Sequence, residues 1–73
     1  MYKDILTNLL NTLGFGKNRQ IRSREQYINQ LSAYTKHDFD ITESSLNTLR
    51  LKCKDVVLIL RIENNVIKEL IIE

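Results

Sequence analysis

Residues 49–62 read LRLKCKDVVLILRI, and this stretch decides the fold. Its first six residues alternate strictly between apolar and basic side chains, which is the period of a half-buried β-strand. Lys54-Asp55 at the end of the alternation is typical of a turn. Residues 56–62 are apolar except for Arg61 and rich in β-branched side chains, as expected of a central strand. The stretch therefore predicts an antiparallel hairpin.

A third strand follows the hairpin. Glu63-Asn64-Asn65 predicts a second turn, because asparagine tolerates a positive φ better than most residues. Residues 66–72 are then again mostly aliphatic. We expect strands over about 48–53, 56–62 and 66–72.

The first half of the chain predicts two helices. Apolar residues recur over 2–13 at helical spacing, and Gly14 can adopt the left-handed conformation that ends a helix. Ser23 is a candidate N-cap for a second helix over about 23–36, with Gln26 completing a capping box. The expected fold is one α+β domain over residues 1–73, with the two helices packed on a three-stranded antiparallel β-meander. Residues 42–47 stay ambiguous, because Thr42 could cap a short helical turn there.

The register of the strands predicts two apolar faces. A two-residue first turn and a three-residue second turn give one core face for the helices, interrupted only by Lys68. The opposite face then carries four aliphatic side chains, and monomers rarely expose so large an apolar patch. A two-residue second turn would redistribute the last strand. The four side chains are Val57, Ile59, Ile67 and Ile71.

We interpret this second apolar face as a protein interface, most simply between two copies of the chain. A domain of 73 residues has a small core, and association is a common supplement to stability at this size. The alternative is that the first helix covers this face.

Basic residues form a second candidate site, although the net charge is only +2. Four of them lie within residues 17–24, which contain no acid and span the connector between the helices and the start of the second helix. Three more share one side of the first strand. Together they suit phosphate groups of nucleic acid or lipid, and the competing interpretation is a solvated linker. The seven residues are Lys17, Arg19, Arg22, Arg24, Arg50, Lys52 and Lys54.

Catalytic and metal chemistry find little support in the sequence. Cys53 is the only cysteine and His37 the only histidine, so an internal disulfide and a structural zinc site are both excluded. We find no nucleophile–base pair and no glycine-rich phosphate loop, and we expect neither enzyme activity nor a cofactor. The sequence therefore predicts a small binding or regulatory protein. We expect it in the cytoplasm, and its size would also suit a phage or plasmid protein.

Two other functions stay open. In a winged-helix arrangement, residues 42–52 would form a DNA-recognition helix and residues 56–72 the wing. Alternatively, the first helix and the basic connector would attach the protein to an anionic membrane surface. We favour neither over a protein partner.

Overall fold

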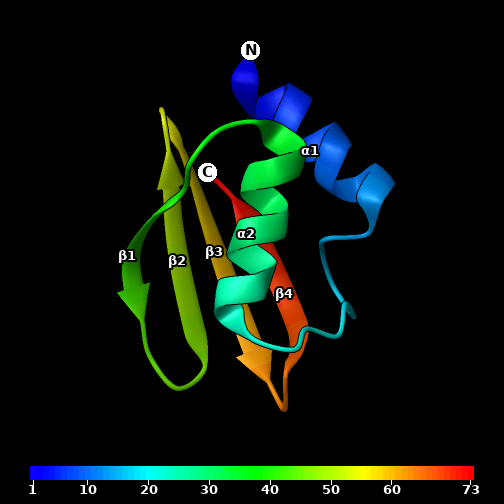
Figure 1. The fold of residues 1–73 in the computed structure, drawn as a ribbon, viewed down its shortest axis with the longest axis vertical. Coiled ribbons are helices and arrows are strands. Elements are labelled where there is room, and N and C mark those ends of the chain that lie inside the picture. Colours follow the sequence, from blue (N-terminus) through cyan, green and yellow to red (C-terminus); the bar gives the residue numbers. More distant parts are fainter.

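The computed structural model describes residues 1–73 and has two helices followed by a four-stranded antiparallel sheet. The strands lie side by side in chain order, and both helices lie on one face of the sheet (Figure 1). This confirms the α+β class with helices first and strands second. Neither helix has the length and apolar character needed to span a membrane. The elements are α1 (Tyr2–Leu13), α2 (Arg24–Thr35), β1 (Asp40–Ser44), β2 (Thr48–Cys53), β3 (Val56–Glu63) and β4 (Val66–Ile72).

Local signals in the sequence determine the helix ends. Gly14 ends α1 in the left-handed conformation with φ 68°, where a side chain would be strained. The Ser23 hydroxyl accepts a 3.0 Å hydrogen bond from the Gln26 N–H, so the N-cap of α2 is as expected. Lys36 ends α2 in the left-handed conformation with φ 58°.

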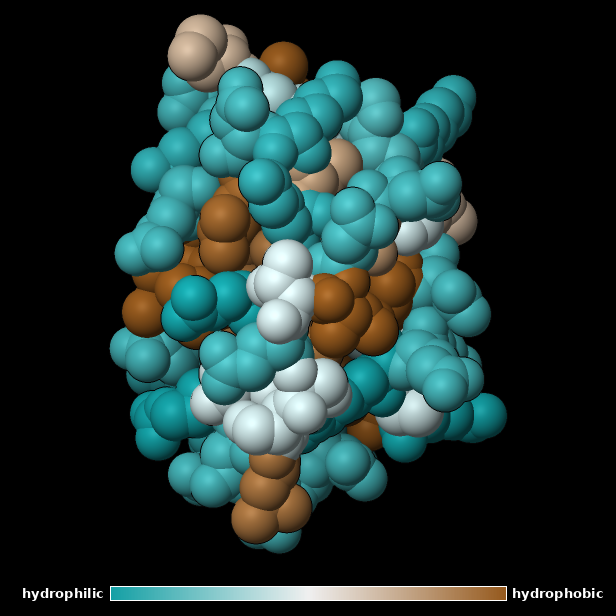
Figure 2. Space-filling view, turned by 90° about the vertical axis from the view of Figure 1, so that its left-hand side faces the viewer, coloured by the Kyte–Doolittle hydropathy of each residue, from teal (hydrophilic) through white to brown (hydrophobic).

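The expectation of three strands was wrong, because Asp40–Ser44 forms an additional edge strand, β1. All five residues of β1 are exposed, and Ile41 is its only apolar side chain, so no alternation marks it in the sequence. Pairing with β2 holds it in place. Residues 42–44 are thus extended, and the helix that a winged-helix arrangement needs over 42–52 is not formed. In a view onto the β1 side of the molecule, hydrophilic and neutral atoms cover much of the surface (Figure 2).

The register of β4 also differs from the three-residue turn that we favoured. Asn64 and Asn65 form a two-residue turn with φ of 53° and 61°, the geometry of a tight hairpin. A β-bulge then shifts the register, so that Ile67 pairs with Ile62 and the exposed Lys68 is left without a partner on β3. Ile67 therefore lies in the core, with none of its surface exposed.

The core lies between the helices and one face of the sheet. Leu6 and Leu10 of α1 and Tyr27 and Leu31 of α2 pack against the buried side chains of the strands. The expected core positions of β2 and β3 are all buried. They are Leu49, Leu51, Cys53, Val56, Leu58, Leu60 and Ile62.

Candidate functional site

The face of the sheet turned away from the helices, called the outer face below, carries three neighbouring aliphatic side chains. Ile59 on β3 pairs directly with Ile71 on β4, and Val57 lies two residues before Ile59 on the same face. Val57 and Ile59 are half-buried, whereas Ile71 is 41% exposed. The fourth expected member, Ile67, points into the core instead, so the apolar patch is smaller than the sequence suggested.

Charged side chains surround the patch with a clear division between strands. Arg50 and Lys52 on β2 pair with Ile59 and Val57, respectively, on one side of the patch. On the other side, Glu69 lies on β4, and the backbone of Glu73 exchanges hydrogen bonds of 2.9 and 2.8 Å with Val57. Cations therefore flank the patch on the β2 side and carboxylates on the β4 side.

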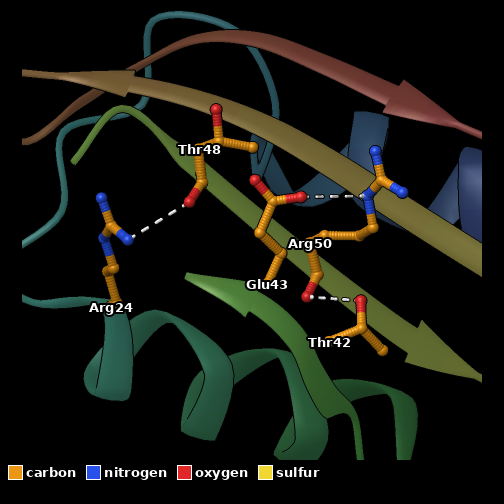
Figure 3. Close-up of polar contacts among 5 residues, drawn as sticks. All are labelled: Arg24, Thr42, Glu43, Thr48 and Arg50. Carbon is orange, nitrogen blue, oxygen red and sulfur yellow. Dashed lines mark hydrogen bonds and ion pairs between the residues drawn. The ribbon is translucent and has the colours of Figure 1, made fainter. Parts of the chain in front are cut away.

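Some of these charges already have partners within the chain. Arg50 Nε lies 3.8 Å from Glu43 Oε1 on β1 (Figure 3). Arg61 lies 3.6 Å from a Glu63 oxygen and 4.0 Å from a Glu69 oxygen. Exposed pairs of this kind contribute little to stability. Lys52 and Glu73 take part in no ion pair, so their charges are available to another molecule.

Arg24, one of the predicted phosphate contacts, has an intramolecular role. Its guanidinium donates hydrogen bonds to the Ser44 hydroxyl at 2.7 Å and to the backbone carbonyls of Leu46 at 2.8 Å and Thr48 at 3.3 Å. Figure 3 shows the guanidinium reaching from α2 to the start of β2. Arg24 therefore ties α2 to the β1–β2 hairpin. The sequence carries no signal for this role, because two of the three acceptors are backbone carbonyls.

Arg19 is also held within the fold. Its guanidinium stacks 4.2 Å from the centre of the Phe15 ring and donates to the Leu13 and Gly14 carbonyls at 3.4 and 3.2 Å. A further contact of 3.4 Å reaches the Gln30 side chain. These contacts fasten the connector to the end of α1 and to α2, so this arginine is not a free phosphate ligand.

The remaining basic residues do not form one patch of free cations. Lys17 and Arg22 are exposed on the connector, whereas Lys52 lies on the outer face of the sheet. The Lys54 ammonium lies 4.8 Å from the centre of the Tyr2 ring, at the β2–β3 turn. The structure thus separates the seven basic residues by role and position.

The residues with reactive side chains lie near the start of α1. The Tyr2 hydroxyl is 3.8 Å from the Cys53 sulfur, and the Tyr2 ring packs edge-on against His37 with centroids 5.3 Å apart. Cys53 is buried and faces the core. No three His, Cys, Asp or Glu side chains converge on a point where they could hold a metal ion. This group joins α1 to the sheet.

Comparison of the chain with protein-family models, curated proteins and solved structures found no match in any of the three.

Proposed function

We propose that this chain is a small non-enzymatic binding protein that associates with a second copy of itself through the outer face. The observation that supports the proposal is the position of Ile59 and Ile71. They are directly paired on a face that no helix covers, and Val57 extends the apolar area beside them. Burying such a face is favourable in proportion to the apolar area removed from water.

The charges around the patch suit a second copy. Two outer faces related by a two-fold axis parallel to β3 place β2 of each copy opposite β4 of the other. Lys52 of each copy then lies opposite Glu73 of the other, and the apolar stem of Arg50 lies over Ile71. A two-fold axis produces each contact twice, so one arrangement joins unpaired charges at both edges of the patch.

Size gives a further reason for association. The chain exposes 4869 Å² in total, and a typical stable interface covers about 800 Å² of each partner. An interface of that area fits on one broad face of the molecule, whose principal extents are 32 × 24 × 20 Å. Such an interface would also bury the half-buried aliphatic side chains of the outer face. This burial would add to the stability of a domain with few buried residues.

Sedimentation equilibrium of the wild type and two variants tests the proposal. Ile59→Lys places a charge at the centre of the patch and is expected to give a monomer, whereas Ile59→Val keeps the apolar surface and is expected to dimerise. Thermal unfolding checks that both variants fold. A wild type that stays monomeric at the highest attainable concentration would overturn the proposal, as would an Ile59→Lys variant that still dimerises.

A further inference from the structure

The two edges of the sheet are protected differently. At the β1 edge, a bulge between Ile41 and Glu43 disrupts the row of backbone N–H and carbonyl groups that another strand would pair with. The carboxylates on β1 itself also hinder such pairing. The β4 edge is protected by the connector along part of its length only. The Arg19 carbonyl accepts from the Ile67 N–H at 2.9 Å, and the Asn18 N–H donates to the Ile67 carbonyl at 2.7 Å.

The second half of the β4 edge is open. Val57 and Glu73 exchange both of their backbone hydrogen bonds, so the alternation of an antiparallel ladder directs those of Ile71 toward β3 as well. The N–H and carbonyl groups of Leu70 and Ile72 consequently point away from β3. The connector does not pair with them, because on its way from α1 it first bonds to β4 at Asn18 and then runs on past Val66 toward the Asn64-Asn65 turn (Figure 1).

A groove of about 610 Å³ runs beside this open edge. Thr7 and Asn11 on the polar side of α1 form one wall, and Leu70 and Ile72 lie on the β4 side. Gly16 also lines the groove, and a side chain there would extend toward Leu70. The groove therefore combines unpaired strand backbone, half-buried aliphatic side chains and a polar helix, which is the combination that captures extended peptides by strand addition.

The charges of the groove favour an acidic occupant. Lys3 and Lys17 line it and take part in no ion pair. Of the two carboxylates that also line it, Glu69 is engaged by Arg61, which leaves Asp4 as the only unpaired acid. The two lysines balance the two carboxylates of the lining in formal charge, and Arg61, 4.0 Å from Glu69, adds a third cation at its edge. Two unpaired cations therefore face one unpaired anion in the groove.

We propose that the open half of the β4 edge binds an extended acidic peptide segment of a partner protein as an added β-strand. The backbone of the peptide pairs with Leu70 and Ile72, continuing the row that the connector begins at Ile67. Its carboxylates lie near Lys3 and Lys17. This site is distinct from the outer face and does not depend on dimerisation.

The probe for the test is a phage-displayed library of random twelve-residue peptides, selected on the full chain. We expect enrichment of sequences that alternate apolar residues with Asp or Glu, and synthetic copies of them should bind in a fluorescence-polarisation assay. Ile72→Pro removes an outward-facing N–H without removing a bond to β3 and should weaken binding at least about tenfold. Lys17→Glu should weaken binding about threefold to tenfold.

Two comparisons make the result decisive. Ile72→Val keeps the N–H and should bind as the wild type does, and Ile59→Lys should also bind normally because it alters only the outer face. Failure to enrich any peptide, or equal binding by Ile72→Pro, overturns the proposal. Loss of self-association in Ile72→Pro, with self-association retained in Ile59→Lys, would identify β4 of a second copy as the occupant and would equally overturn it.

Discussion

The Tyr27 hydroxyl donates a 2.9 Å hydrogen bond to the backbone carbonyl of Phe15, and both residues are almost completely buried. The two rings also pack edge-on, with centroids 5.5 Å apart. One side chain of α2 therefore holds the connector where it leaves α1. The pair positions the connector that closes half of the β4 edge.

Tyr27→Phe should lower the free energy of unfolding by about 1–3 kcal/mol, because it leaves a buried carbonyl without a donor while keeping the ring. Urea unfolding measures the change. Tyr34→Phe is the matched control: Tyr34 is 58% exposed and also lies beside the Phe15 ring, so losing its hydroxyl should change stability by less than about 0.5 kcal/mol. Equal losses in the two variants would contradict the role given to Tyr27.

Arg24→Ala should loosen the β1–β2 hairpin, because it removes the donor that ties Ser44 and the Leu46 and Thr48 carbonyls to α2. We expect faster amide hydrogen exchange across residues 40–48 and a loss of about 1–2 kcal/mol in stability. Arg22→Ala is the control, since Arg22 is exposed and makes no hydrogen bond in the structure. If exchange in the hairpin stays unchanged in Arg24→Ala, the three contacts do not hold it.

A charge exchange tests the arrangement of the dimer. Lys52→Glu and Glu73→Lys should each weaken dimerisation about threefold to tenfold, since each places like charges opposite one another twice. Combining the two should restore the wild-type dissociation constant. Lys36→Glu changes the net charge of the chain as Lys52→Glu does but lies at the end of α2, and should leave dimerisation unchanged. Sedimentation at low salt compares these four variants with the wild type. A double variant no better than the singles would exclude this pairing.

Alkaline pH should destabilise the protein in part through Tyr2. Burial first, and then the hydrogen bond with Cys53, raises the pKa of Tyr2 from 10.0 to about 12. The folded state thus prefers the neutral phenol, so this contribution to stability is complete below pH 10 and is lost as the pH rises from 10 toward 12. Burial also raises the pKa of Tyr27, which adds to the loss in the same direction.

Urea unfolding at a series of pH values across this range measures the effect. Tyr2→Phe should show a shallower decline than the wild type, because Tyr27 alone of these two phenols then remains to ionise. Parallel declines in the two proteins would show that ionisation of Tyr2 is not linked to folding.

Sequence patterns predicted β2, β3 and the core that they form. Strict alternation in residues 49–54 and the aliphatic run from Val56 place every second side chain on one face, and those side chains are buried. The end of α1 and the start of α2 were predicted equally well, since Gly14 and Ser23 act through local backbone geometry. Strand alternation and helix capping depend on residues close together in the chain, so both can be predicted from the sequence.

The last strand shows where such patterns fail. Val66, Ile67, Ile71 and Ile72 are all aliphatic, so apolar character alone does not say which of them point inward. The tight Asn64-Asn65 turn and the bulge at Lys68 decide this, and together they bury Ile67 and leave Ile71 on the outer face. One change of register thus redefined the patch proposed as an interface.

By itself, the sequence determined the class of fold, the order of the two helices and of β2, β3 and β4, and the apolar outer surface of β3. Only the tertiary structure decided that DITES forms a fourth strand, that Arg19 and Arg24 bond within the chain, and that the β4 edge is half open. The physical reason is the range of the interactions involved. Periodicity and capping act between residues a few positions apart, whereas strand edges and arginine contacts depend on segments brought together only by folding.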